Sequence, residues 1–338
     1  MHTGRRYRLM QTLSWSRWNL LLPLGWAFLA AAGYELLGMD QLALPWLPMS
    51  LVGVAVAFYL GFKNNASYDR LWEARKIWGA IVNASRSWAF SARDLVSDLH
   101  ADGQIEPDAL ETERATLILR HVAWLDALRH QLRRVKTWEH SGERYDRVRK
   151  AVGAPEYRED LREQLERSLP ADEAQQVLEQ INPAAHLLAN QSRHLGQLRA
   201  RGLVDGFAHM ELQKLLHELM AQQGKAERIK NFPFPRQYAT VNSIFAWTFA
   251  ALVPFGMLAE FSSLGDGLAW LAVPFSGLVS WVFLTTDQIG DWSENPFEGL
   301  ANDVPITAMS RGIERDILQM LGRKELPPAR ALEGMIQF

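Results

Sequence analysis

Three bulky apolar residues form a regular series in the first part of the chain. Val54, Phe58 and Phe62 lie four residues apart, so on an α-helix they form one stripe along one face. If several copies turned this stripe toward a shared axis, it would form apolar rings, and a narrow apolar pore excludes water and ions. The alternative is that the stripe contacts lipid or the protein core. The spacing alone leaves both interpretations open.

Small residues form a second stripe beside the first. Gly53, Ala57 and Gly61 are also four residues apart, and this spacing lets transmembrane helices approach closely. The apolar run from Leu44 to Phe62 contains both stripes and is long enough to cross a hydrocarbon core of roughly 30 Å. We therefore expect one membrane helix with a bulky face and a face for helix packing.

Acidic residues gather where the last apolar segment ends: Asp287, Asp291, Glu294 and Asp303. One interpretation is a cation site or a hinge where the chain leaves the membrane. The other, which we favour, is that Asp291, Ser293 and Asn302 cap helix ends.

Histidines occur in two pairs with eight-residue spacing, His186 with His194 and His209 with His217. Two helical turns place the members of a pair too far apart to share a metal ion, whose ligand nitrogens lie at roughly 2 Å. We expect these histidines to be surface or core residues. The sequence also lacks a phosphate-binding loop, a GxSxG motif and an HExxH motif. We therefore expect neither enzymatic activity nor a bound cofactor or metal.

Basic residues are absent from two long parts of the chain. No Lys or Arg occurs between Arg17 and Lys63 or between Arg236 and Arg311, although the 338 residues include 36 basic ones. Each part holds two apolar segments of membrane-spanning length, at 18–37 and 44–62, and at 239–259 and 268–286. This pattern predicts four transmembrane helices.

The placement of positive charge predicts the orientation of these helices. Cytoplasmic loops of membrane proteins are enriched in Lys and Arg, and the short N-terminal segment carries Arg5, Arg6, Arg8 and Arg17. We expect both termini to be cytoplasmic. The predicted domains are an N-terminal segment with two membrane helices (1–62), a cytoplasmic helical domain (63–236), a second pair of membrane helices (237–289) and a cytoplasmic tail (290–338).

The large polar block between the apolar parts is predicted to be helical, which makes the fold class all-α. Residues 63–236 show no strand-like alternation of useful length, and Pro107 suits the first turn of a helix. Further helices are expected over 155–169, 183–201 and 205–223, the last one ending at Gly224. The net charge of −2 gives no indication of a nucleic-acid partner. The absence of cysteine excludes disulfides and thiolate metal sites.

Three motifs resemble those of the bestrophin family in its bacterial form. They are NNASYDRLWEARKIWG at 64–79, ERIKNFPFP at 227–235 and ENPF at 294–297, in the family's order and over most of the chain. The family-signature positions in this sequence are Asn64, Asn65, Tyr68, Asp69, Arg70, Trp72, Glu294, Asn295, Pro296 and Phe297.

The resemblance implies an ion channel in the bacterial inner membrane, built as a homopentamer around a central axial pore in the lipid bilayer. It implies that the second membrane helix carries a hydrophobic neck, and the match around Gly61 and Arg70 places this neck on Val54, Phe58 and Phe62. A second constriction, the cytoplasmic aperture, is implied at Phe207 or, alternatively, at Val204. The permeant species would be small monovalent ions: chloride or other anions by family, or sodium-type cations as in some bacterial members.

The segment after Pro296 and Phe297 departs from the family's pattern. Animal bestrophins bind calcium there with a run of acidic residues, whereas EGLANDVP contains only Glu298 and Asp303 as acids. Because calcium needs six to eight oxygen ligands, we expect no calcium gating. Ion selectivity is expected to arise outside the apolar neck, at the aperture, at helix termini facing the lumen or at charged vestibule residues such as Lys63.

Two other classes of protein compete with the channel. A secondary transporter would use broken helices at the membrane midplane; Pro254 and Pro274 suggest breaks, but no charged residue lies mid-segment. A membrane-anchored helical scaffold or enzyme would place its function in residues 63–236, where the sequence shows no catalytic motif.

Overall fold

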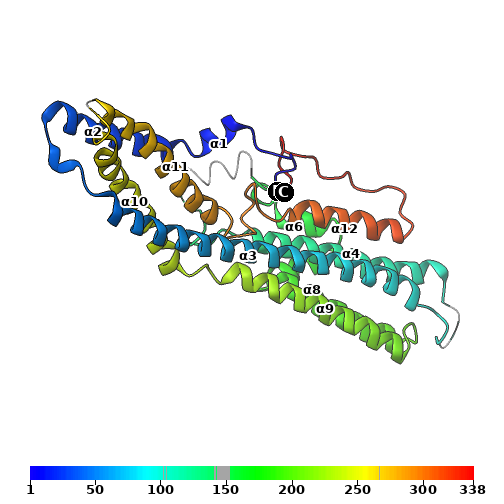
Figure 1. The fold of residues 1–338 in the computed structure, drawn as a ribbon. Helices are drawn as coiled ribbons and strands as arrows, with labels where there is room; N and C mark the ends of the chain where they lie inside the picture. Colours follow the sequence, from blue (N-terminus) through cyan, green and yellow to red (C-terminus); the bar gives the residue numbers. More distant parts are fainter. Residues whose placement is uncertain (102, 104, 141, 143–152, 266) are drawn as a thin grey trace. The chain divides into compact units, whose positions relative to one another are not determined.

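The computed structural model describes residues 1–101, 103, 105–140, 142, 153–265 and 267–338. Within these residues the secondary structure is helical (Figure 1). Two isolated β-bridges lie near the chain ends. The chain divides into two compact units. We call Gly4–Arg70 with Pro233–Asn295 the apolar unit, and Met1–Thr3 with Leu71–Phe232 and Pro296–Phe338 the polar unit.

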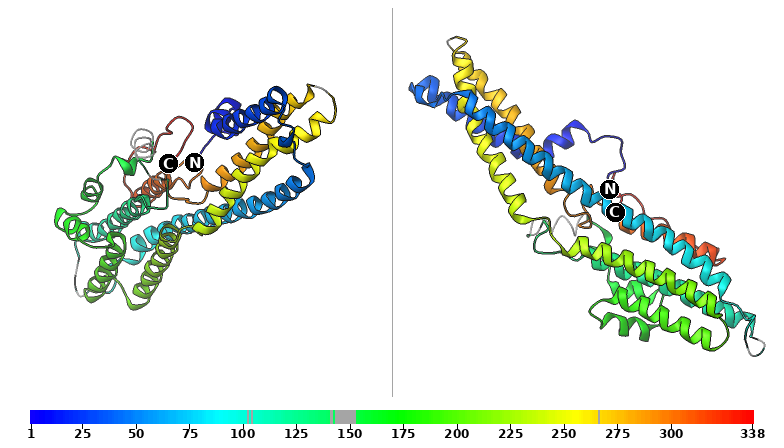
Figure 2. Two further views of the ribbon diagram at one scale, coloured as in Figure 1. Left: turned by 90° about the vertical axis from the view of Figure 1, so that its left-hand side faces the viewer. Right: turned by 60° about the horizontal axis from the view of Figure 1, so that its bottom comes forward.

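Among its described residues, the apolar unit contains four helices that are long and apolar enough to cross a membrane, which confirms the prediction of four candidate spans. Its elements are α1 (Leu9–Trp15), α2 (Arg17–Leu37), η1 (Asp40–Leu42), the first part of α3 (Trp46–Leu95), α10 (Arg236–Ser262), η3 (Leu268–Leu271) and α11 (Ala272–Asp291). Helices α2, α10 and α11 contact one another (Figure 2).

Glycines permit the close packing of the helices in the apolar unit. A Cβ atom on Gly53 of α3 would lie 2.8 Å from the ring of Phe249 on α10, and one on Gly256 would lie 2.6 Å from the ring of Trp46. Near these contacts, Val56 and Leu60 of α3 join a buried cluster with α10 and α11. Small residues thus bring the backbones together, as is usual between membrane helices.

Helix α3 does not end at the last residue of the apolar run. It continues as one helix from Trp46 to Leu95, through the polar sequence that begins at Lys63. The stretch has no proline after Pro48 and is rich in Ala, with several Arg, both of which are good helix formers. The neck stripe and the motif at 64–79 therefore belong to one helix.

The polar unit is a helical bundle in which α4 (Pro107–Arg133) contacts most of the other elements. The other elements of the polar unit after α4 are η2 (Pro155–Tyr157), α6 (Leu161–Glu166), α7 (Ala171–Leu178), α8 (Pro183–Ala200), α9 (Gly206–Asn231) and α12 (Ile306–Met320). Helices α4, α8 and α9 lie side by side (Figure 2). One buried cluster holds the unit together and includes Trp78, Trp88, Trp124 and Phe297.

Pro107 stands in the first turn of α4, as predicted, but two predicted helix boundaries in the polar unit are wrong. Residues 155–169 form a short 3-10 turn and the separate helix α6, because Asp160 caps a new helix through a hydrogen bond from the Arg162 amide (3.0 Å). Helix α9 passes through Gly224 and ends at Asn231. A helical glycine costs only about 1 kcal/mol relative to alanine, and burial of Ala226 and Ile229 in the next turn offsets this.

Candidate functional site

The predicted neck residues share one exposed face of α3. Val54, Phe58 and Phe62 are 58 %, 66 % and 63 % exposed in the single chain. The rings of Phe58 and Phe62 lie 6.3 Å apart between centroids, so they form a continuous surface. The buried side chains of this part of α3 are on other positions, among them Val56 and Leu60. The stripe is therefore free of the chain's own core and available to lipid or to other copies.

The three residues of the small-residue stripe differ in burial. Gly53 is buried against Phe249, whereas Ala57 and Gly61 are exposed. A Cβ atom on Gly61 would meet no atom within 4 Å. Within one chain, the packing role predicted for this stripe thus applies to Gly53.

Lys63 was predicted to be a charged vestibule residue, and this is wrong, because its side chain is buried. Its ammonium group lies 2.6 Å from a carboxylate oxygen of Asp287 and 2.6 Å from one of Asp291, both near the end of α11. The neighbouring Asn64 donates a hydrogen bond to the Thr286 carbonyl (3.1 Å). A buried ammonium requires such partners, since an unpaired buried charge is strongly destabilising. Lys63 and Asn64, which directly follow the neck stripe, therefore link α3 to α11 through ion pairs and a hydrogen bond.

The interpretation of the acidic residues as helix caps is also wrong in its main assignments. Asp291 is ion-paired with Lys63, and the N-cap residue of α12 is Pro305, which has no capping side chain. The cation that Asp287 and Asp291 bind is a lysine of the same chain. Among the residues that the structure describes, no group of three His, Asp or Glu side chains is arranged to hold a metal ion.

Glu294 of the ENPF motif contacts residues from both sequence segments of the apolar unit. Its carbonyl accepts a hydrogen bond from Arg70 Nε (2.8 Å), and its carboxylate is ion-paired with Arg236. Asn295 Nδ2 donates to the same carboxylate (3.3 Å). Burial raises the pKa of Glu294, and the charge of Arg236 opposes that rise.

The remaining signature residues are distributed between surface and core. Asn65, Tyr68, Asp69 and Trp72 are exposed on α3, whereas Phe297 is buried in the core of the polar unit. A cavity of about 590 Å³ in the apolar unit is lined by Phe62, Asn65, Ala66, Asp69, Arg70, Phe234, Pro235 and Tyr238. The last neck residue and the first signature residues thus share one cavity wall.

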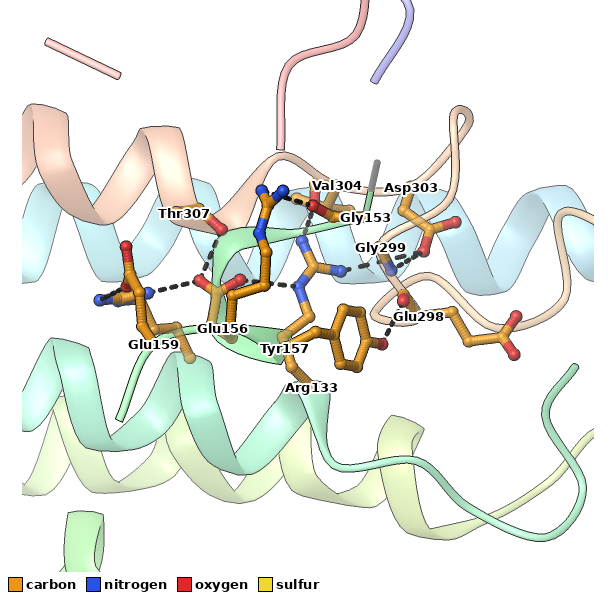
Figure 3. A network of polar contacts seen from close by, with 12 residues as sticks. Arg133, Gly153, Glu156, Tyr157, Glu159, Glu298, Gly299, Asp303, Val304 and Thr307 are labelled. Carbon is orange, nitrogen blue, oxygen red and sulfur yellow. Dashed lines mark hydrogen bonds and ion pairs between the residues drawn. The ribbon is translucent and has the colours of Figure 1, made fainter. Parts of the chain in front are cut away.

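Arg133 of α4 lies at the centre of a buried polar network in the polar unit (Figure 3). Its guanidinium is 3.8 Å from a carboxylate oxygen of Glu156 and 3.9 Å from one of Asp303. Asp303 also accepts hydrogen bonds from the backbone amides of Gly299 (2.6 Å) and Leu300 (3.0 Å). Burial opposes the charge of Asp303 more strongly than Arg133 favours it, so the pKa of Asp303 is raised to about 7.

The other carboxylates of this region are also engaged. Glu156 is 2.6 Å from Arg129 Nη1 and accepts a hydrogen bond from the Thr307 hydroxyl (2.6 Å). Although burial disfavours its charge, Arg129 and Arg133 lower the pKa of Glu156 to about 2. Glu298 accepts a hydrogen bond from the backbone amide of His140 (2.5 Å). The acidic residues that follow Phe297 thus form ion pairs and hydrogen bonds within the chain.

The two candidates for the cytoplasmic aperture differ in burial. Phe207, in the first turn of α9, is 87 % exposed, whereas Val204 is 2 % exposed and belongs to the core of the polar unit. Asp205 accepts hydrogen bonds from the amides of Phe207 (2.6 Å) and Ala208 (2.9 Å), so it caps α9 and fixes the position of Phe207.

Comparison with known proteins identifies the family. The family of bacterial and fungal bestrophin proteins matches residues 15–319 of this chain. The chain belongs to the bestrophin family. The expected resemblance is thereby confirmed, and with it the all-α membrane fold.

Individual relatives of this bestrophin agree with that assignment. A voltage-dependent anion channel-forming protein of Ralstonia nicotianae is 30 % identical over 86 % of this chain and 81 % of its own length. The voltage-dependent anion channel-forming protein YneE of Escherichia coli is 28 % identical over 83 % of this chain and 78 % of its own. The crystal structure of a bacterial bestrophin homologue from Klebsiella pneumoniae superimposes with a TM-score of 0.74 at 27 % identity, covering 91 % of this chain and 99 % of that one.

Sequence reasoning missed two features of this bestrophin. The ion pairs of Lys63 bring together residues more than 200 positions apart, and their only sequence signal is a cation that ends one apolar segment and acids that end another. The Arg133 network gave no signal, because its members are ordinary charged residues in a charge-rich region. Of its carboxylates, only Asp303 was considered from the sequence, as part of a possible cation site or calcium-binding segment.

Proposed function

We propose that this bestrophin is an ion channel formed by five identical chains around an axial pore, with Val54, Phe58 and Phe62 lining a hydrophobic neck. The relatives named above as voltage-dependent anion channel-forming proteins support the channel function. Among the residues that the structure describes, one chain has four helices long and apolar enough to cross a membrane, too few to enclose a water column. A closed ring of identical subunits provides the enclosure.

The exposure of the stripe is the observation that carries the proposal. Val54, Phe58 and Phe62 turn away from the helices of their own chain, while Lys63 on another face of α3 is bound to α11. Repeated around an axis, the stripe gives three apolar rings stacked along the pore. An ion there loses its hydration without replacement, which costs several kcal/mol. Small movements of the rings then change the flux strongly, since about 1.4 kcal/mol corresponds to a factor of ten.

Phe207 is the better of the two candidates for the cytoplasmic aperture. Its ring is exposed at the start of α9, so it can project into a lumen. Val204 is packed in the core and would have to leave it to line a pore. We therefore place the second constriction at Phe207.

The permeant ions are small and monovalent, and the names of the relatives favour anions. The chain lies in the inner membrane with both termini and the polar unit in the cytoplasm, because Arg5, Arg6, Arg8 and Arg17 are concentrated at the N-terminus. The channel carries out no catalysis and needs no cofactor. Reversal potentials measured in asymmetric salt would show whether the channel prefers anions or cations.

The test is ion flux through purified protein in lipid vesicles and single-channel recording in planar bilayers. Phe58→Ala or Phe62→Ala should raise flux several-fold, Val54→Ala should raise it less, and native mass should correspond to five chains. Phe28→Ala removes an exposed aromatic ring from α2 and is the matched control with unchanged flux. Unchanged conductance in all three neck variants would refute the neck. Flux without discrete conductance steps would indicate a transporter, and protein without flux would indicate a scaffold.

A further inference from the structure

A cavity lies beside Phe207 in the polar unit. It has a volume of about 580 Å³ and is lined by His100, Arg199, Asp205, Gly206, Phe207 and Met210. His100 is in the turn that follows α3, and Arg199 is near the end of α8. Two parts of the chain that are far apart in sequence, at His100 and at 199–210, thus place ionisable side chains around the exposed aromatic ring.

The backbone holds these segments in close contact. The Ser97 amide donates a hydrogen bond to the Leu203 carbonyl (2.9 Å), which joins the turn after α3 to the α8–α9 loop (Figure 1). Gly202 has a φ of +72°, and a Cβ atom there would lie 2.4 Å from the His100 carbonyl oxygen. The turn after α3 and the α8–α9 loop are therefore packed together, and this packing fixes the backbone position of His100.

Asp205 is the carboxylate next to His100. The imidazole Nε2 lies 4.0 Å from a carboxylate oxygen of Asp205, and the two side chains are 63 % and 42 % exposed. The hydrogen bond from the Ala208 amide is the largest influence on Asp205 and lowers its pKa, so this carboxylate stays charged at neutral pH.

The formal charge beside Phe207 depends on that imidazole. Arg199 and Asp205 cancel, so the cavity is neutral when His100 is neutral and carries one positive charge when His100 is protonated. Histidine is the side chain that ordinarily changes charge between pH 5 and 8. Other charged or titratable residues on the adjoining segments that the structure describes include Asp98, Glu106, Arg201, His209 and Glu211, and Arg201 is ion-paired with Glu113.

We propose that His100 is a selectivity-determining residue, whose protonation adds positive charge next to the Phe207 aperture and raises the preference of the channel for anions. The inference rests on the proposed function, since it needs a lumen at Phe207. In a pentamer, His100 occurs five times around one axis, so its protonation can form a ring of positive charge. A ring of like charge at a narrow passage concentrates anions and repels cations. Its effect decreases at high salt, where the Debye length falls to about 3 Å.

The experiment measures the ratio of chloride to sodium permeability from reversal potentials between pH 8 and pH 5.5. The wild type should show roughly a threefold or larger rise in this ratio on acidification at low salt. His100→Gln should abolish the rise, and His100→Lys should give high anion preference at both pH values. His217→Gln, at an exposed position on α9, is the control and should behave as the wild type does.

The outcomes separate the inference from the function on which it rests. Ion flux with a permeability ratio independent of pH, or with a rise that persists in His100→Gln, would overturn the role of His100 and leave the channel intact. A rise that is lost in His209→Gln and kept in His100→Gln would assign the effect to the other histidine and also overturn it. Absence of flux in the wild type would overturn the proposed function and the inference together.

Discussion

The ammonium group of Lys63 lies 2.6 Å from a carboxylate oxygen of Asp287, and both side chains are buried. Lys63 directly follows Phe62, the last residue of the neck stripe. Successive residues of a helix are about 100° apart around its axis, so binding Lys63 to α11 turns the stripe away from α11. The ion pair therefore sets the direction in which Val54, Phe58 and Phe62 point.

Removal of the lysine charge should destabilise the apolar unit. Lys63→Met leaves Asp287 buried without its cation, and breaking a buried pair costs about 3–5 kcal/mol. We expect a clearly lower melting temperature in detergent, with Asp287→Asn nearly as harmful and Asp291→Asn milder, because Asp291 is partly exposed. Lys76→Met breaks an exposed pair with Glu73 and should cost less than about 1 kcal/mol. Equal melting temperatures for Lys63→Met and Lys76→Met would contradict this assignment.

The two aperture candidates predict opposite phenotypes. Phe207→Ala removes an exposed ring and should increase the permeability of large ions relative to chloride without changing the melting temperature. Val204→Ala removes buried methyl groups, so it should lower the unfolding free energy by about 1–3 kcal/mol and leave relative permeability unchanged. The measurements are reversal potentials with a series of anions of increasing size and thermal unfolding of both variants. The reverse pattern would move the aperture to Val204.

Asp303 should make stability depend on pH. Because burial raises its pKa from 3.8 to about 7, the folded chain keeps a proton that the unfolded chain has lost over that range. Stability contributed by this group therefore falls as the pH rises from about 4 to about 7. Asp303→Asn retains an oxygen that can accept the Gly299 and Leu300 amides but cannot titrate, so its melting temperature should decline less between pH 5 and pH 7.

Glu156 provides the contrast to Asp303. Its pKa is lowered to about 2, so its stabilising contribution is fully present above about pH 4.5 and is lost as the pH falls toward 2. Glu156→Gln should lower the melting temperature by a similar amount at pH 5 and pH 7. For Asp303, an equal decline of the melting temperature between pH 5 and pH 7 in the wild type and in Asp303→Asn would show that Asp303 does not titrate between these pH values.

Calcium should not gate this channel. The carboxylates of Glu298 and Asp303 are occupied by His140, by backbone amides and by Arg133, and a calcium ion would need several carboxylate oxygens free to rearrange. We expect equal vesicle flux with calcium chelated and with submicromolar calcium present. Steep activation in that range would mean that these ion pairs open to admit the metal.

The sequence predicts those features that depend on local spacing. The apolar segments, the first turn of α4 at Pro107 and the family motifs are all properties of adjacent residues. Partnerships made by folding could not be read in this way: Lys63 looked like a vestibule charge because Asp287 and Asp291 lie far along the chain. The predicted end of α9 at Gly224 was wrong for a related reason. A single glycine destabilises a helix only slightly, and burial of Ala226 and Ile229 in the folded chain offsets that cost. The choice between Val204 and Phe207 likewise required knowledge of which side chain the core covers.

Substituted-cysteine accessibility tests the neck most directly, since the natural chain has no cysteine and gives no background. Val54→Cys, Phe58→Cys and Phe62→Cys should each react with a charged, membrane-impermeant thiol reagent and change the current irreversibly. Phe28→Cys, on α2, should be unaffected. If the three neck positions proved as unreactive as Phe28→Cys while the channel still conducted, the stripe would face lipid and ions would follow another path.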